Sequence, residues 1–289
     1  MKEGCFIKAA LETTLSKKID ILSGNIVLGG DISKASSIQT EEGNFFIKWN
    51  THAIPDLFEK EVHGLAILKS TNTINIPEVI GFGSVENQYY LIIELIERGA
   101  PNSKFWDSFG QQLADLHRHS SPNYGLDIDN FIGRLPQINK QHENWVDFFV
   151  ENRLDYQLQL GLTNQVLTAA FASKIEKLYN KLPTLLPTEK PALLHGDLWS
   201  GNFLCDQKGN PCIYDPAVYY GNREMEIAFT QLFGGFDSRF YHAYNEAFPL
   251  QKGFEERKDL YNIYPLLVHA NLFGGSYASS VDRILSRFI

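Results

Sequence analysis

The sequence is poor in cysteine and in basic residues and has no long apolar run, and each shortage excludes a class of protein. Three cysteines among 289 residues are too few, and odd in number, for a disulfide framework. Lys and Arg number 26 against 34 Asp and Glu, and the net charge of −8 argues against nucleic acid as a partner. No apolar stretch approaches the roughly 18 residues that a membrane-spanning helix needs.

The first residues give no sign of export. Residues 1–15 carry scattered charges and lack the continuous apolar segment of a secretory signal. Cys205 and Cys212 flank an expected hairpin turn, where they are most simply packed thiols in a reducing compartment. We therefore expect a cytoplasmic protein without a membrane partner, and a monomer is favoured.

The remaining composition, 44% apolar and 21% charged, is that of an ordinary folded protein. Short strand-like runs dominate as far as residue 97, a polar break follows at residues 98–103, and helical patterns dominate afterwards. We predict an α+β fold with a small β-rich nucleotide-binding lobe in residues 1–97. A larger, mainly helical lobe in residues 98–289 would carry catalysis and substrate binding.

The most informative stretch, residues 192–216, places Asp197, Asn202 and Asp215 among apolar flanks. A turn at residues 207–210 would fold the chain back and bring Asp215 beside Asn202. The motif His-Gly-Asp alone is more often part of a structural turn than a catalytic motif. Two carboxylates and a carboxamide on one loop, however, suit a divalent metal and a phosphate chain, and the spacing matches a kinase catalytic loop. The interlocking spacing favours the catalytic interpretation.

Two segments are expected to contact a nucleotide through their backbone. Gly29 and Gly30 lie between two expected strands, as in a phosphate-covering loop, although a Gly-Gly pair serves equally well in a plain hairpin. Glu94, Leu95 and Ile96 end a strand just before the polar break, where an adenine edge could hydrogen-bond to the hinge.

A lysine and a glutamate are expected to form an ion pair across the N-terminal part. Lys48 lies on the strand of residues 44–49, and alternation puts it on the same face as Phe46. Glu61 follows on a helix for which Asp56 is the expected N-cap. Most helical glutamates are solvated, but the order of strand lysine and helix glutamate favours a pair that binds phosphate.

The C-terminal part is expected to be mainly helical. A helix over residues 105–119 ends in His-Arg-His, for which capping of the helix end is a better explanation than metal binding. Residues 130–139 have the character of a loop, and residues 145–161 that of a continuous helix.

Several longer motifs resemble the fructosamine kinase (ketosamine kinase) family, within the wider group of aminoglycoside phosphotransferase-like and protein-kinase-like folds. The resemblance covers nearly the whole chain and implies a bilobal, protein-kinase-like fold. Its motifs are GGDISKA at 29–35, FFIKWN at 45–50, FEKEVHGL at 58–65, NFIGRLPQIN at 130–139, HGDLWSGN at 195–202, DPAVYYGNRE at 215–224, LFGGF at 232–236 and NLFGGSY at 271–277.

The resemblance implies a role for each candidate residue. Asp197 resembles the catalytic base that accepts the substrate hydroxyl proton, and Asn202 and Asp215 resemble the Mg²⁺ ligands. Lys48 resembles the phosphate-binding lysine, with Glu61 as its partner. In addition, Gly29 and Gly30 would cover the phosphates, Glu94, Leu95 and Ile96 would contact adenine, and Trp199 would line the sugar pocket unless it only packs.

The implied activity is ATP-dependent phosphorylation of a sugar hydroxyl on a ketosamine, a sugar-modified amine or protein lysine, which leads to deglycation. Asp31 stands where some family members have a regulatory cysteine, so redox regulation is not implied. Glu226 stands in a segment where the family usually has Asp, a change expected to lie outside the phosphoryl-transfer residues.

Other kinds of protein stay open. The strongest rival is another small-molecule kinase, of the aminoglycoside or choline type, because its catalytic machinery would be identical. A signalling protein kinase is disfavoured, because the stretch from Asp215 to Glu224 leaves no room for a long activation segment. A non-catalytic ATP-binding module is disfavoured as well, because the predicted catalytic residues are all present.

Overall fold

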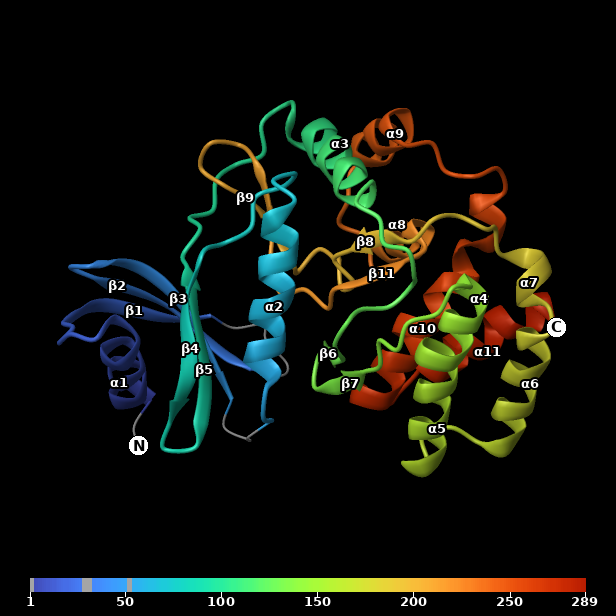
Figure 1. Cartoon of the computed structure of the whole chain (residues 1–289), viewed down its shortest axis with the longest axis horizontal. Coiled ribbons are helices and arrows are strands. Elements are labelled where there is room, and N and C mark those ends of the chain that lie inside the picture. The colour runs from blue at the N-terminus through green and yellow to red at the C-terminus, as the bar shows by residue number, and fades with distance from the viewer. Residues whose placement is uncertain (1–2, 28–32, 51–53) are drawn as a thin grey trace.

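The N-terminal part of the chain forms an antiparallel sheet with a helix on each face (Figure 1). The computed structural model describes residues 3–27, 33–50 and 54–289. The five strands follow the order β1-β2-β3-β5-β4. Their bounds are Ile21–Val27 for β1, Lys34–Thr40 for β2, Gly43–Asn50 for β3, Val79–Val85 for β4 and Gln88–Glu94 for β5, with α1 at Glu3–Leu15 and α2 at Leu57–Ser70.

Strand β3 divides its side chains between the two faces of the sheet. Phe45, Ile47 and Trp49 are buried in a cluster with α1. Phe46 and Lys48 lie on the opposite face and line the large cavity of the protein. The alternation confirms that Phe46 and Lys48 share a face. Burial of each large apolar side chain beneath α1 contributes about 2 kcal/mol to folding.

Helix α2 lies between the sheet and the C-terminal part (Figure 1). Its buried face includes Phe58, Leu65 and Leu68, which belong to the core cluster that continues into the C-terminal part. The predicted N-cap, Asp56, precedes the helix but has a left-handed backbone, and its side chain makes no capping hydrogen bond. Asp56 therefore occupies the N-cap position, as predicted, but its side chain does not cap the first turn.

The C-terminal part is mainly helical and, within the described residues, also contains three short two-stranded sheets, β6–β7, β8–β11 and β9–β10. Its helices are α3 (Phe105–His117), α4 (Trp145–Phe148), α5 (Tyr156–Thr163), α6 (Ala169–Tyr179), α7 (Leu182–Leu185), α8 (Arg223–Leu232), α9 (Ser238–Ala247), α10 (Phe254–Phe273) and α11 (Tyr277–Phe288). Its strands are β6 (Asn130–Ile132), β7 (Leu135–Gln137), β8 (Ala192–Leu194), β9 (Phe203–Cys205), β10 (Pro211–Ile213) and β11 (Tyr219–Gly221).

Two segments of the C-terminal part differ from their prediction. The expected loop at residues 130–139 contains the hairpin β6–β7. The expected continuous helix at residues 145–161 is interrupted by a π-helical segment, η1 (Phe149–Asp155). The π-helical turn carries Arg153, whose side chain is fully buried. Such wider turns are rare and often accompany functional sites.

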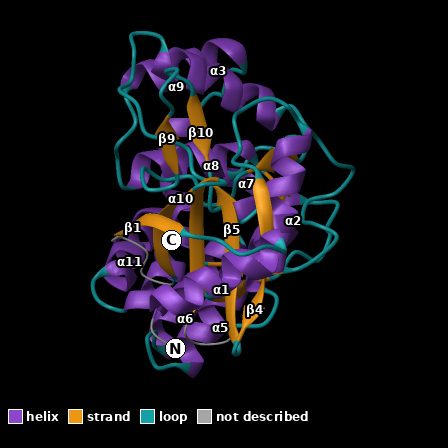
Figure 2. Cartoon of the chain, turned by 90° about the vertical axis from the view of Figure 1, so that its left-hand side faces the viewer, coloured by secondary structure: helices purple, strands orange, loops and turns teal. Residues whose placement is uncertain are grey.

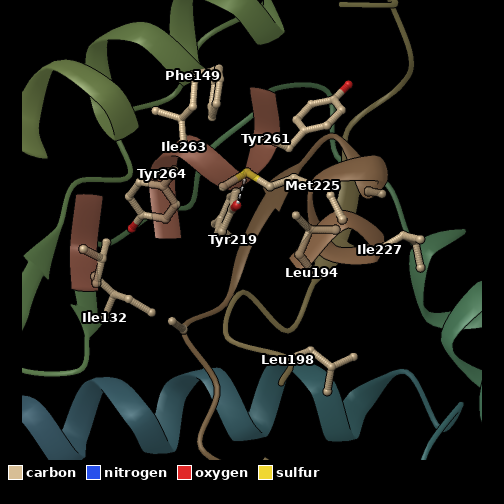
Figure 3. Packing of buried hydrophobic residues seen from close by; sticks show 14 of the residues in the cluster. Ile132, Phe149, Leu194, Leu198, Tyr219, Met225, Ile227, Tyr261, Ile263 and Tyr264 are labelled. Carbon is tan, nitrogen blue, oxygen red and sulfur yellow. Dashed lines mark hydrogen bonds between the residues drawn. The ribbon is translucent and has the colours of Figure 1, made fainter. Parts of the chain in front are cut away.

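Helix α10 forms the centre of the C-terminal core. It packs against α8, α11 and α5, and much of its length is buried. Figure 3 shows Tyr261, Ile263 and Tyr264 of α10 beside Tyr219 and Met225, whose hydroxyl and sulfur are 3.1 Å apart. In the turned view of Figure 2, α3 and α9 lie together at one end, beyond the β9–β10 hairpin. In the described ranges, no helix is long and apolar enough to cross a membrane.

Candidate active site

The catalytic loop follows β8 and is fixed against the chain after β10. The Ala217 N–H donates to the carbonyl oxygen of His195 at 2.9 Å. Gly196 has a φ of 84°, and a Cβ there would collide with the Ala217 carbonyl. Only glycine fits this turn without strain. The loop therefore leaves β8 in a direction that carries Asp197 into the cavity.

Asp197 and Asn202 contact each other across this loop. The Asn202 Nδ2 donates to the Asp197 carbonyl at 2.9 Å and to its Oδ2 at 3.0 Å. Burial and the nearby Asp215 carboxylate raise the pKa of Asp197 well above its usual value, although the bond from Asn202 opposes them. A carboxylate with a raised pKa is better suited to accept a proton at neutral pH.

Lys48, Glu61 and Asp215 meet beside Asp197 and Asn202, on the same side of the cavity. The Lys48 Nζ lies 3.0 and 2.9 Å from the two carboxylate oxygens of Glu61, and it also contacts Asp215. Burial alone would lower the pKa of Lys48, but the two carboxylates outweigh it and raise that pKa. Burial raises the pKa of Glu61 to about 8, against the effect of Lys48. The structure thus brings together the lysine and the glutamate that the sequence predicted to pair.

Asp215 adopts a backbone that a non-glycine residue rarely takes, with a φ of 59°. The Tyr214 N–H donates to the Asn202 carbonyl at 3.1 Å, so the β9–β10 hairpin brings the two predicted metal ligands together. Burial would raise the pKa of Asp215, but Lys48 holds it below its usual value. Such strained conformations concentrate at functional sites, where surrounding contacts maintain them.

The donor set at this point fits Mg²⁺. Asn202 uses its Nδ2 for Asp197, which leaves its Oδ1 as an acceptor, and Asp215 supplies a carboxylate. In the part of the chain that the structure describes, no group of three or more His, Cys, Asp or Glu side chains could hold a metal. A site with two protein oxygens is typical of Mg²⁺, which retains water and substrate phosphates in its shell.

The predicted hinge lines the same cavity through Glu94, Leu95 and Ile96. The Glu94 N–H already donates to the Glu78 carbonyl at 2.8 Å, and the Leu95 N–H approaches the Asn44 carbonyl at 3.4 Å. Ile96 has no such bond to the described backbone, so its N–H is the best placed of the three for a ligand. Gly29 and Gly30 lie outside the described residues, as does Asp31.

The cavity has a volume of about 1250 Å³ and extends from the hinge to the C-terminal helices. Its far side is an aromatic wall, which we define as Trp199, Phe233, His269, Phe273 and Tyr277. Three of its rings are unusually exposed, at 38% for Trp199, 41% for Phe233 and 48% for Phe273. The His269 ring lies 4.9 to 5.6 Å from the three rings of Phe233, Phe273 and Tyr277.

Trp199 depends on a neighbouring glycine for its position. A Cβ on Gly201 would collide with the indole ring, so the ring lies directly over the Gly201 backbone. The indole thus belongs to the same loop as Asp197, and both residues line the cavity. The structure places Trp199 in the cavity, as predicted for a residue that lines a substrate pocket.

The sequence analysis missed Glu226, which supports the catalytic loop from α8. Its carboxylate accepts the N–H of His195 at 3.1 Å and that of Gly196 at 2.7 Å. It also lies 2.9 Å from the Nε2 of His117. Glu226 does lie outside the reacting residues, as predicted, but it holds the backbone from which Asp197 projects. The available signal was that Glu226 stands where the family usually has Asp, so the family pattern also has an acidic residue there.

His117 corrects the prediction that the residues at the end of α3 cap a helix. Its side chain is fully buried between Tyr244 and Glu226, with Nδ1 2.7 Å from the tyrosine oxygen. Arg223 can only donate, and its Nη1 lies 3.3 Å from the same oxygen. Because the Glu226 carboxylate can only accept, the Nε2–H of His117 donates to it. A capping role was wrong because the helix end is covered by α9.

Comparisons with known proteins agree with this geometry. The sequence profile of the fructosamine kinase family matches residues 5–289. A probable ketoamine kinase of Enterococcus faecium is 38% identical over 271 residues, which are 92% of this chain and 96% of that protein. A chloroplastic protein-ribulosamine 3-kinase of Oryza sativa subsp. indica is 38% identical over 281 residues, which are 96% of this chain and 81% of that protein.

Solved structures show the same fold. A Haemophilus somnus protein, proposed to be a fructosamine-3-kinase, superposes with a TM-score of 0.88 at 29% identity, covering 99% of this chain and 97% of that one. An aminoglycoside phosphotransferase superposes with a TM-score of 0.63 at 16% identity, covering 97% and 98%, a likeness of fold alone. The predicted α+β, protein-kinase-like fold is confirmed, whereas the lobe boundary at residue 97 stays a prediction. The chain belongs to the fructosamine kinase family.

Proposed function

We propose that this protein is an ATP-dependent kinase that phosphorylates a sugar hydroxyl of a ketosamine. One observation carries the proposal: Asp197, Asn202, Asp215 and the Lys48–Glu61 pair converge on one cavity whose other side is aromatic. Phosphoryl transfer depends mainly on positioning and electrostatic stabilisation, and these groups supply both. Membership of the fructosamine kinase family supports the choice of acceptor.

Each charged group has a defined task in this proposal. Lys48, oriented by Glu61, binds the phosphates of ATP. Asn202 and Asp215 would hold Mg²⁺, which when bound would neutralise charge on the phosphates. Asp197 accepts a hydrogen bond from the substrate hydroxyl and takes its proton as the oxygen attacks the γ-phosphorus. The bond between that phosphorus and the β–γ bridging oxygen breaks, and ADP leaves with the electron pair.

The adenine would be held at the hinge. Glu94 uses its backbone N–H and its Oε2 within the protein, on the carbonyl and the N–H of Glu78 respectively. We therefore narrow the predicted hinge contacts to Ile96, whose N–H would donate to the adenine edge. The role of Gly29 and Gly30 in a loop that covers the phosphates remains a prediction.

The aromatic wall favours a sugar over the polycation of an aminoglycoside. Rings stack well on the C–H faces of a sugar, and they tolerate the single positive charge of a ketosamine amine. Of the described carboxylates that line the cavity from the C-terminal part, Asp197 and Asp215 serve the reaction, and Glu226 is occupied by the loop amides. None of them remains to bind several ammonium groups.

The hydroxyl on carbon 3 is the proposed acceptor, because the rice relative is a ribulosamine 3-kinase by name. The family resemblance implies that the phosphorylated adduct is unstable, so the consequence would be deglycation of amines or protein lysines. The free cysteines Cys5, Cys205 and Cys212 suit a reducing compartment such as the cytoplasm. Burial, and then the nearby Glu94, raises the pKa of Cys212 to about 12, which makes a reactive thiolate there unfavourable.

The proposal is tested by Mg²⁺-dependent ATP consumption with four acceptors: ribulosamine and fructosamine derivatives of lysine, an aminoglycoside, and choline. Turnover of a ketosamine with phosphate on the sugar, located by phosphorus NMR, is the expected result. Turnover of the aminoglycoside or choline, with neither ketosamine consumed, would retain the kinase chemistry and overturn the acceptor assignment.

A further inference from the structure

Three buried carboxamides from the segment 130–139 form a cluster at the edge of the cavity, which Asn130 lines: Asn130, Gln137 and Asn139, which we call the carboxamide cluster. Each is at most 7% exposed. The Asn130 Oδ1 accepts the Gln137 Nε2 at 2.8 Å and the Asn139 Nδ2 at 3.0 Å. Buried amides of this kind are costly unless they are paired, so their arrangement is strongly specified.

The carboxamide cluster contacts the backbone that follows Asp215. The Asn130 Nδ2 donates to the Val218 carbonyl at 2.8 Å, and the Gln137 Nε2 donates to the Ala217 carbonyl at 3.0 Å. On its other side, Ala217 donates its N–H to His195. The segment after Asp215 is thus held from two directions, by the catalytic loop and by the carboxamide cluster.

A buried arginine sets the direction of every bond in the carboxamide cluster. Arg153 donates to the Ile138 carbonyl at 2.6 Å and to the Asn139 Oδ1 at 2.8 Å. Because a guanidinium can only donate, Asn139 must present its oxygen to Arg153 and its Nδ2 to Asn130. Asn130 must then present its oxygen to Asn139, which leaves its Nδ2 for Val218.

Aromatic rings, not a carboxylate, surround the guanidinium. Its carbon lies 4.0 Å from the ring centre of Tyr219 and 4.6 Å from that of Phe148. No ion pair to Arg153 occurs within the described residues. On the other side of the cluster, the Tyr264 hydroxyl donates to the Gln137 Oε1 at 2.7 Å, which fixes the orientation of that amide as well.

We propose that the carboxamide cluster, given its direction by Arg153, is a positioning device that holds Asp215 in its left-handed conformation for metal binding. A φ of 59° costs a non-glycine residue about 1 kcal/mol or more, and fixed neighbours are needed to maintain it. Gln137 and Asn130 fix the backbone two and three residues after Asp215, respectively. The proposal rests on the proposed function, in which Asp215 holds Mg²⁺.

The test replaces the donors without changing their size, in Asn130→Asp and Gln137→Met. Asn130→Asp turns an acceptor toward the Val218 carbonyl, and Gln137→Met removes the bond to Ala217. The matched control is Gln157→Met: Gln157 is 1% exposed and bonds to Asn271, away from the cavity. ATP affinity is measured by calorimetry with Mg²⁺ and with EDTA, beside kcat and the half-saturating Mg²⁺ concentration.

The expected result is a loss of roughly tenfold in the Mg²⁺-dependent part of ATP affinity for both variants, which corresponds to about 1.4 kcal/mol. ATP affinity in EDTA and the KM for the acceptor should change less than about twofold. Gln157→Met should lower the melting temperature and leave the Mg²⁺ requirement as in the wild type. A general loss of stability would not lower the Mg²⁺-dependent part of ATP affinity while leaving ATP affinity in EDTA unchanged.

A folded Asn130→Asp or Gln137→Met variant with the wild-type Mg²⁺ requirement would overturn the inference. If Asn130→Asp does not fold, Gln137→Met decides, because it removes the three hydrogen bonds of the Gln137 side chain and adds no charge. A wild-type protein that binds ATP equally well with and without Mg²⁺ would instead contradict the proposed function itself, so the two failures are distinguishable.

Discussion

The two sides of the cavity are built from opposite kinds of residue. On one side, Lys48, Glu61, Asp197 and Asp215 lie close together, and the pKa of each is shifted by at least one of the others. On the other side, the aromatic wall presents exposed rings. The charged side suits a reaction that any kinase of this fold carries out, whereas the aromatic side suits the choice of acceptor. Fold alone does not decide that choice.

The two sides also differ in the contacts that support them. The charged side is supported by two buried chains of hydrogen bonds, and each begins at a donor-only guanidinium. Arg223 starts the chain that passes through His117 to Glu226, and Arg153 starts the one that reaches Ala217 and Val218. The aromatic wall is held by ring contacts instead. Substitutions on the charged side should therefore change the rate and metal binding, whereas substitutions in the aromatic wall should change the affinity for the acceptor.

The largest effect is expected from Asp197→Asn on the charged side. The carboxamide cannot take the hydroxyl proton, so kcat should fall roughly 10²–10⁴-fold. ATP affinity should stay within about twofold, because Asp197 contacts Asn202 and not the predicted phosphate ligand Lys48. Steady-state kinetics and calorimetry measure both quantities. An unchanged kcat would remove Asp197 from the mechanism.

Asp215→Ala should abolish the Mg²⁺-dependent part of nucleotide affinity, because the carboxylate is the charged metal ligand of the site. Asp206→Ala is the control: Asp206 belongs to the exposed turn of the same hairpin, where it accepts the N–H of Lys208. Calorimetric titration with MgATP distinguishes the two. Normal MgATP affinity in Asp215→Ala would show that another group holds the metal.

Glu226→Gln tests the support of the charged side. Burial alone would raise the pKa of Glu226, but the bond from His117 and the Gly196 N–H hold it below its ordinary value of 4.5. A depressed pKa means that the carboxylate stabilises the folded state above about pH 4.5, and that this stabilisation is lost as the pH falls through the folded pKa. The variant should lose about 2 kcal/mol at neutral pH.

Thermal unfolding of the wild type and Glu226→Gln, from about pH 7 to pH 4, measures this difference. The gap between the two should narrow toward the acid end. Glu246→Gln is the control, because Glu246 forms an exposed pair with His242. A constant gap at every pH would mean that the charge of Glu226 does not stabilise the fold.

The smallest effect is expected on the aromatic side. Phe233→Leu removes one exposed ring of the aromatic wall, which should raise the KM for a ketosamine roughly fivefold, or about 1 kcal/mol, with kcat changed less than about twofold. Phe82→Leu is the control, because Phe82 is 45% exposed on β4 and does not line the cavity. If Phe233→Leu and Phe82→Leu had the same KM for the ketosamine, the aromatic wall would not take part in acceptor binding.

The charged side could be predicted from the sequence because most of its residues are polar exceptions within or directly beside apolar strands. Lys48 follows from strand alternation, and Asn202 and Asp215 follow from a hairpin with clear turn residues. The supporting residues could not be predicted in the same way. Glu226 lies on α8, where the other charged residues, Arg223 and Glu224, are buried as well. The charged residues of this helix therefore do not divide into an exposed set and a buried set, so the sequence has no pattern that marks Glu226.

The carboxamide cluster was hidden for a different reason. Asn, Gly and Pro in residues 130–139 are the residues of a loop, and their use as a buried network depends on tertiary partners from η1 and α10. His117 was misread because a histidine at a helix end is usually a cap. Local patterns show which residues are polar, whereas the partners that bury them are distant in sequence.

The separation of the two sides is tested most directly by acceptor binding to Asp197→Asn, saturated with Mg²⁺ and a non-hydrolysable ATP analogue. This account predicts that a lysine ketosamine binds this inactive variant within about threefold of the wild type, and that adding Phe233→Leu weakens binding roughly fivefold. Loss of acceptor binding in Asp197→Asn alone, or unchanged binding on adding Phe233→Leu, would show that the two sides do not divide catalysis and recognition between them.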